Sequence, residues 1–123
     1  MQPTEIKLHR KSAVLELAYS DGAFNLTAEF LRVFSPSAEV KGHGPGQETL
    51  QFGKRHVTFR DLTPQGNYAI KLVFSDGHDS GIYSWQYLRE LCETQEARWQ
   101  DYLEKLDAAG KSREPQFIAV DQS

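Results

Sequence analysis

Two SDG tripeptides, at residues 20–22 and 75–77, constrain the fold of this 123-residue chain more than any other feature. Each lies between two short stretches in which apolar residues alternate with others. An Asp-Gly pair in that position predicts a β-hairpin, because glycine accepts the positive φ of a tight turn. A helix-capping residue and a Leu-Arg pair follow each hairpin. The two halves of the chain therefore predict the same order of strand, turn, strand and helix.

Alternation of apolar and other residues marks further strands. It predicts strands in the segments EIKLH, AVLELAY, AFNL, TLQF, HVTFRDLTP, YAIKLVF and SGIY. In the sixth of these segments the alternation places four side chains on one face: Tyr68, Ile70, Leu72 and Phe74. These segments predict antiparallel pairing, because the turns that join several of them are short.

Two helices are predicted from capping residues and apolar spacing. Thr27 is the N-cap expected for a short helix that ends before Pro36. Ser84 is the N-cap expected for a long helix that Gly110 would end. Its apolar stripe, expected to pack against the sheet, consists of Trp85, Leu88, Cys92, Trp99, Leu103 and Leu106.

These elements predict an α+β fold, in which an antiparallel β-sheet of about five to seven strands packs against one short helix and a long C-terminal helix. Residues 35–48 are rich in Gly, Ser and Pro and are expected to form a loop. The length fits a single domain, assigned to residues 1–110, and residues 111–123 are expected to be a loosely ordered C-terminal tail.

Charge and cysteine content narrow the class of protein. The formal net charge of −3 opposes general binding to nucleic acids, which requires clustered Lys and Arg. The N-terminal residues lack the apolar run of a secretory signal, and no segment is apolar enough to cross a membrane. The single cysteine, Cys92, excludes an internal disulfide and is expected to be buried and inert. We therefore expect a cytoplasmic protein.

Three segments resemble a family of small domains: LELAYSDG, AEFLRVFSPSA and PQGNYAIKLVFSDGHDSGIYSWQYLREL. The chain resembles the DUF971 family, also called the gamma-butyrobetaine hydroxylase-like N-terminal domain, over roughly residues 5–92. In carnitine-pathway hydroxylases such a domain precedes the catalytic one and carries zinc on a Cys-x-Cys-x-x-Cys cluster and a distant histidine. The family also appears fused to P-loop carriers of iron-sulfur assembly.

The resemblance implies a degenerate zinc site in this chain. Aligned on Leu31-Arg32 and Pro36, the three cysteine positions fall on Ser35, Ser37 and Val40, and the histidine corresponds to His78. A protonated serine hydroxyl is a poor zinc ligand, and valine cannot coordinate a metal. No metal and no other cofactor are therefore predicted.

The candidate binding residues are Arg32, Tyr68, Asp76, His78, Tyr83 and Trp85. A structural role is favoured for His78, with partner binding and metal or catalytic roles as the alternatives. Arg32 and its counterpart Arg89 are each expected either to be a surface charge or to pair with the aspartate of the neighbouring DG turn, Asp21 or Asp76. The three aromatic residues are expected to lie mostly in the core, with polar edges able to line a groove.

No catalytic residue is predicted. Asp76, Asp79 and Ser80 lie near His78 in sequence, but adjacency does not supply the geometry of a nucleophile and its base. The sequence therefore predicts a non-catalytic protein-binding or adaptor module rather than an enzyme. The alternative is an accessory factor in iron-sulfur or metal cofactor assembly that acts with a P-loop carrier. Small-ligand binding beside Tyr68, His78 and Trp85 is a third possibility. The expected partner is another protein, and neither nucleic acid nor a membrane is expected to bind.

Overall fold

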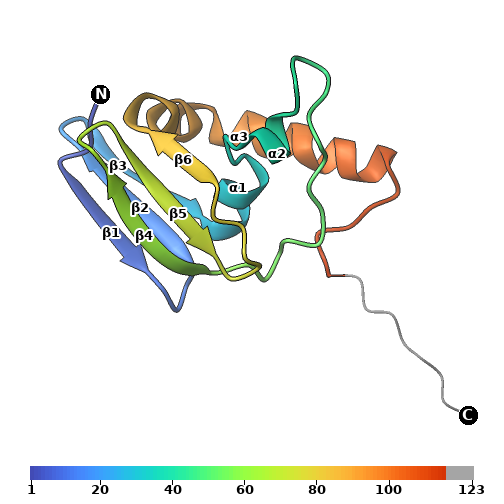
Figure 1. Ribbon diagram of the computed structural model, residues 1–123, viewed down its shortest axis with the longest axis horizontal. Coiled ribbons are helices and arrows are strands. Elements are labelled where there is room, and N and C mark those ends of the chain that lie inside the picture. The colour runs from blue at the N-terminus through green and yellow to red at the C-terminus, as the bar shows by residue number, and fades with distance from the viewer. Residues whose placement is uncertain (116–123) are drawn as a thin grey trace, which may run out of the picture.

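A computed structural model describes residues 1–115, and residues 116–123 lie outside the described part. Within residues 1–115, six strands form two three-stranded antiparallel sheets (Figure 1). The first sheet has the order β1 (Glu5–His9), β2 (Val14–Tyr19), β3 (Gly22–Thr27). The second has the order β4 (Phe59–Gln65), β5 (Ala69–Phe74), β6 (Gly81–Ser84). The α+β class is confirmed, and the strands are divided between two sheets.

Both SDG tripeptides lie at the turns of hairpins. In the first hairpin Tyr19 pairs with Gly22, so Ser20 and Asp21 form the turn, one residue earlier than the predicted Asp-Gly pair. In the second, the longer segment 75–80 joins β5 to β6. Both predicted hairpins are confirmed.

The helices begin at the predicted caps. Thr27 Oγ1 accepts a hydrogen bond from the Phe30 amide at 3.0 Å at the start of α1 (Ala28–Val33). Ser84 Oγ accepts one from the Tyr87 amide at 3.1 Å at the start of α3 (Trp85–Ala108). Each cap satisfies an amide that the first turn of the helix leaves without a partner. Gly110, with φ of 66°, follows the end of α3 as predicted.

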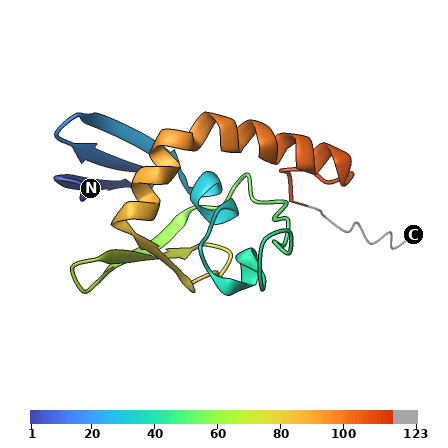
Figure 2. The same ribbon diagram turned by 90° about the horizontal axis from the view of Figure 1, so that it is seen from above.

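One hydrophobic core joins both sheets to α1 and the first half of α3. Its fully buried members include Leu15, Leu17, Leu26, Phe30, Leu72, Phe74, Tyr83, Leu88 and Leu91. Farther along α3, Tyr102 and Leu106 form a second cluster with Val33, at the end of α1. The stripe on α3 therefore packs only partly against the sheets, because the helix continues past them (Figure 2).

Three local predictions are wrong. The segment TLQF forms no strand, and β4 begins only at Phe59. The predicted loop 35–48 contains a short helix, α2 (Ala38–Lys41). Tyr68 precedes β5 and is 60% exposed instead of lying in the core with Ile70. These short segments carry too few residues for periodicity to distinguish one structure from another.

Ion pairs cross between the two halves of the chain. The Arg32 Nε atom lies 2.8 Å from Asp76 Oδ2, and Arg89 binds both carboxylate oxygens of Asp21 at 3.0 and 2.7 Å. Each arginine therefore reaches the aspartate of the other half. The predicted pairing with a turn aspartate is confirmed, but the partner is the aspartate of the distant turn and not, as predicted, that of the neighbouring one.

The segment after α3 returns to the domain. The amides of Gly53 and Arg55 donate to the carbonyls of Ser112 and Arg113, and the Arg113 side chain binds the buried carboxylate of Glu29 at 2.7 and 2.8 Å. This part of the predicted tail is therefore anchored, whereas residues 116–123 lie outside the described residues.

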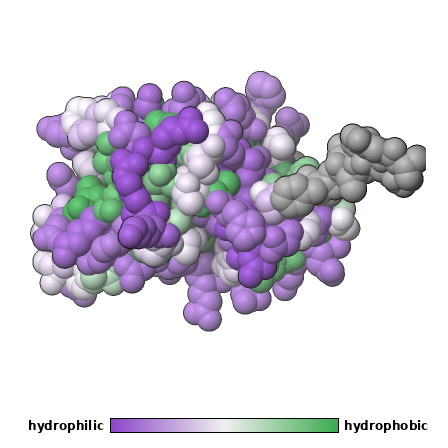
Figure 3. Space-filling view, turned by 90° about the horizontal axis from the view of Figure 1, so that it is seen from below, coloured by the Kyte–Doolittle hydropathy of each residue, from purple (hydrophilic) through white to green (hydrophobic). Residues whose placement is uncertain are grey.

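The surface in Figure 3 is largely hydrophilic, with hydrophobic side chains in small separate patches. Within residues 1–115, no helix has both the length and the apolar composition needed to cross a bilayer.

Candidate functional site

The polar cluster around His78 is the strongest candidate site, because the structure gathers there several residues that are far apart in sequence. The side chain of His78 is 3% exposed. Its Nε2 atom lies 2.8 Å from Ser35 Oγ and 3.4 Å from Ser37 Oγ. Both serines are buried. Three of the four positions that the family resemblance assigned to zinc ligands therefore meet at one place.

The turn between β5 and β6 positions the imidazole. The Phe74 amide donates to the His78 carbonyl at 2.9 Å, and the His78 amide donates to Asp76 Oδ1 at 3.1 Å. These bonds fix the backbone on both sides of the turn, so the His78 side chain is directed into the link between α1 and α2.

Ser35 fits its position because β6 carries a glycine beside it. A Cβ atom on Gly81 would lie 2.7 Å from Ser35 Oγ and 3.0 Å from the ring of Tyr83. Tyr83 is itself fully buried and donates its hydroxyl hydrogen to the Leu31 carbonyl. Close packing of β6 against the end of α1 therefore encloses the serine hydroxyl.

The cluster also includes the charged residues Arg32, Asp76 and Lys54. Besides Arg32, Asp76 binds Lys54 at 2.6 Å, and the Arg32 guanidinium also donates to Gln51 at 2.9 Å. Burial opposes ionisation of Asp76, but hydrogen bonds from Lys54 and the His78 amide and the charge of Arg32 lower its pKa to about 2. Asp76 is thus a permanent anion between two cations at neutral pH.

The imidazole is held neutral by its surroundings. Burial lowers the pKa of His78 from 6.5, and the positive charges of Arg32 and Lys54 act in the same direction, while Glu39 and Asp76 oppose them. Glu39 Oε2 lies 3.6 Å from His78 Nδ1. Assigning the proton of the neutral ring to Nδ1 leaves Nε2 to accept a hydrogen bond from Ser35.

We expect the depressed pKa of His78 to make the fold less stable in mild acid. The unfolded chain binds a proton at His78 more readily than the folded chain does, so the free energy of unfolding should fall as pH decreases below about 6.5. Chemical denaturation at a series of pH values between 7.5 and 5 measures this slope. His78→Gln should flatten it, and His43→Gln, at an exposed position, should leave it unchanged. Equal slopes for wild type and His78→Gln would contradict the assignment.

The donor set does not fit zinc. Ser35 and Ser37 offer hydroxyls that remain protonated near neutral pH, Val40 offers no donor atom, and a single imidazole is too few ligands. Among residues 1–115, no three His, Cys, Asp or Glu side chains are close enough together to hold a metal ion.

The six predicted binding residues separate into two groups. Arg32, Asp76 and His78 belong to the cluster, and Tyr83 packs beneath it. Trp85 lies elsewhere, where its indole N–H donates to the Asn67 carbonyl at 2.8 Å and its amide donates to the carbonyl of Tyr68. Two cavities lie elsewhere in the described part of the chain, and none of Tyr68, His78 and Trp85 lines either of them.

Sequence reasoning missed Lys54, Gln51 and Glu39 as members of the cluster. Gln51 comes from a predicted strand, Glu39 from a predicted loop and Lys54 from the residues between two predicted strands, and no motif links them to Asp76 or His78. Only the tertiary arrangement reveals them.

Comparisons with known proteins support the fold and show the family. Residues 6–89 match the family model described as "Gamma-butyrobetaine hydroxylase-like, N-terminal". One NMR structure is 49% identical, with a TM-score of 0.83 over 98% of this chain and 95% of that one. A second is 48% identical, with a TM-score of 0.78 over 99% of this chain and 92% of that one.

A crystal structure from Acidithiobacillus ferrooxidans ATCC 23270, described as a protein of unknown function in the DUF971 family, is 42% identical. Its TM-score is 0.60 over 73% of this chain and 91% of that one. No curated protein matches the chain significantly. The match over residues 6–89 shows that the chain belongs to the gamma-butyrobetaine hydroxylase-like N-terminal domain family.

Proposed function

We propose that this chain is a non-catalytic protein-binding module, an adaptor that holds a partner protein without transforming it. The observation that carries the proposal is the enclosure of the Ser35–His78 pair. A serine nucleophile must be reachable by its substrate, and Ser35 is only 1% exposed. The Ser37 amide donates a hydrogen bond to this hydroxyl at 3.3 Å. That amide is therefore not free to stabilise an oxyanion, as a backbone amide beside a catalytic serine would.

We assign the cluster a structural role instead. It fastens the link between α1 and α2 to the turn between β5 and β6 through Ser35–His78 and Arg32–Asp76. Both contacts join residues more than 40 positions apart in sequence. A rigid scaffold of this kind presents its surface to a partner at little cost in ordering.

Affinity capture from the native organism with the full chain as bait, followed by mass spectrometry, tests the proposal. We expect one protein to be enriched stoichiometrically over a bait-free control. A metabolite screen with the purified chain is the counterpart measurement. Capture that recovers no partner, together with turnover of a metabolite, would overturn the adaptor function.

A P-loop carrier of iron-sulfur assembly is the first partner to test, because the family that this chain resembles appears fused to such carriers. We place the interaction in the cytoplasm, where Cys92 would stay reduced. This thiol is buried, and burial raises its pKa to about 11, so it is a poor ligand for a cluster in the folded chain. Elemental analysis of untagged protein separates contact with a carrier from metal delivery: stoichiometric iron or zinc would favour delivery.

A further inference from the structure

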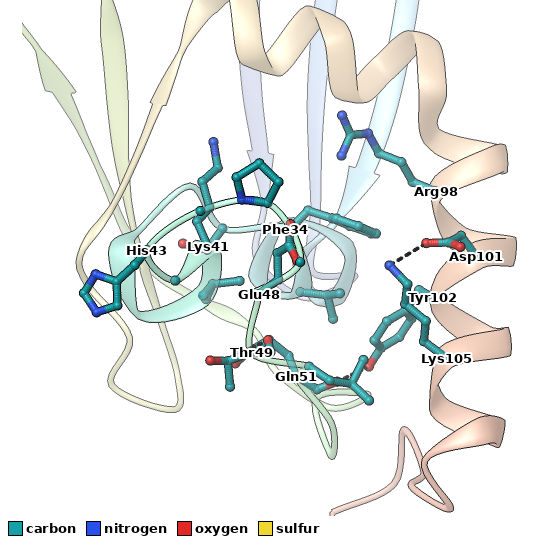
Figure 4. A pocket seen from close by; sticks show the side chains of 18 of the residues that line it. Phe34, Lys41, His43, Glu48, Thr49, Gln51, Arg98, Asp101, Tyr102 and Lys105 are labelled. Atoms are coloured by element: carbon teal, nitrogen blue, oxygen red, sulfur yellow. Dashed lines mark hydrogen bonds and ion pairs between the residues drawn. The ribbon is translucent and has the colours of Figure 1, made fainter.

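A long groove separate from the His78 side chain lies between α3 and the segment from α2 to Gln51. The cavity has a volume of about 1020 Å³ (Figure 4). In this view α3 forms one wall with Arg98, Asp101, Tyr102 and Lys105, and α2 with the loop after it forms the other. Of the cluster described above, Ser35 and Gln51 line its edge.

The inner surface of the groove is apolar. It is lined by Val33, Phe34, Val40, Leu50, Tyr87 and Tyr102. The hydroxyls of Tyr87 and Tyr102 donate to the carbonyls of Phe34 and Gln51 at 2.7 and 2.9 Å. Their hydrogen-bonding capacity as donors is used within the domain, so the two rings offer mainly apolar surface to an occupant.

The outer wall, formed by α2 and the loop after it, is held in place by backbone contacts. The Thr49 amide donates to the Val40 carbonyl at 2.8 Å, which closes the loop. Gly42 has φ of 71°, and a Cβ atom there would lie 2.1 Å from the Gln47 carbonyl oxygen, so only glycine fits. These contacts constrain the loop, which reduces the entropy cost of ordering it around an occupant.

The shape of the groove favours an extended chain over a compact metabolite. Its lining on α3 runs from Tyr87 to Lys105. At a rise of 1.5 Å per residue this stretch is about 27 Å long. An extended peptide of about eight residues has the same length.

The charges of the groove identify the chemistry of that peptide. Lys105 pairs with Asp101 at 2.9 Å, and Arg98 lies 3.6 Å from Glu90. Lys41 is exposed and lies 4.8 Å from the centre of the Tyr87 ring, and within residues 1–115 it has no carboxylate partner inside 4.0 Å. Glu48, on the outer wall, likewise has no cationic partner among the described residues.

We propose that this groove binds an extended segment of the partner protein, about eight residues long. The segment carries an acidic side chain that pairs with Lys41 and apolar side chains that pack on Phe34, Val40 and Leu50. The segment also carries a basic side chain that pairs with Glu48, the acidic groove residue without a cationic partner in the described part of the chain. This inference rests on the proposed adaptor function and names the surface that performs it.

Selection of random linear octapeptides displayed on phage, with the full chain as bait, tests the inference. We expect enriched peptides to combine an Asp or Glu with apolar residues. A selected peptide, synthesised with a fluorescent label, should bind Lys41→Glu at least tenfold more weakly than wild type in an anisotropy titration. Lys11→Glu is the matched control, because Lys11 is exposed in the turn between β1 and β2 and does not line the groove. Its affinity should stay within twofold of wild type.

Nuclear magnetic resonance locates the bound peptide independently of any substitution. Amide shifts should change in residues 40–51 and along α3 from Tyr87 to Lys105. Changes confined to other elements, equal affinities for the two charge reversals, or enriched peptides without acidic residues would overturn the inference. Self-association of the free chain that Lys41→Glu abolishes would assign the groove to a second copy and would overturn it also.

The experiments separate this inference from the proposed function. If no octapeptide is enriched while affinity capture still recovers a partner, the groove assignment fails and the adaptor function stands. If capture recovers a partner that Lys41→Glu retains as well as Lys11→Glu does, the partner binds another surface. If capture recovers nothing and a metabolite is turned over, the adaptor function fails.

Discussion

Asp76→Ala is expected to lower the free energy of unfolding by about 3 kcal/mol, because it leaves the guanidinium of Arg32 buried without its carboxylate. The side chain of Arg32 is 9% exposed and that of Asp76 is 21% exposed, so water cannot replace the lost partner fully. The substitution also removes the acceptor of the His78 amide. Urea denaturation at pH 7 measures the change.

Two further variants separate charge from shape at this position. Asp76→Asn keeps an oxygen for the His78 amide and should cost less than Asp76→Ala. Asp79→Ala, at an exposed residue of the same turn that makes no ion pair among the described residues, should change stability by less than about 0.5 kcal/mol. If Asp76→Ala were no more destabilising than Asp79→Ala, the Arg32–Asp76 contact would have no stabilising role.

The triple variant Ser35→Cys, Ser37→Cys, Val40→Cys is expected to gain a tight zinc site. Ser35 Oγ and Ser37 Oγ already lie 2.8 and 3.4 Å from His78 Nε2, so thiolates at these positions would face the imidazole. A complete Cys₃His set in structural sites binds zinc with apparent free energies of about 10–16 kcal/mol. We therefore expect one zinc ion per chain and a Kd in the nanomolar range or tighter.

Competition with a chromophoric chelator measures this affinity, and cobalt substitution reports thiolate ligation through its absorption bands. The wild type, with Cys92 as its one cysteine, provides the baseline. Adding His78→Ala to the triple variant should weaken binding, because it removes the fourth ligand. A triple variant that takes up no zinc, or whose affinity does not depend on His78, would show that these four positions do not form one coordination sphere.

The sequence could predict the elements whose signals are local. Thr27 and Ser84 cap their helices where expected, since a hydroxyl at that position satisfies amides only one turn away. The strands around the SDG turns were likewise predicted, since alternation over six residues distinguishes the buried face of a strand. Tyr68 was placed in the core wrongly, because its apolar ring continues the alternation of β5 although the strand begins one residue later.

The candidate site was predictable only in part. His78, Ser35 and Ser37 could be grouped by resemblance to the family, and the structure brings them together. Lys54 and Gln51 could not, because they contact Asp76 and Arg32 through an irregular segment between α2 and β4 that has no period. The groove beside α3 was also missed, since the short helix that begins its outer wall lies in a segment rich in Gly, Ser and Pro.

The crossed arginine–aspartate pairs bear on how the two halves depend on each other. Each half consists of a three-stranded meander that leads into a helix. Taken alone, either half would lose the contacts that its arginine and its aspartate make with the other half, Arg32 with Asp76 and Arg89 with Asp21. Because one hydrophobic core also joins both sheets, the two halves are expected to unfold together in a single cooperative transition and not one after the other.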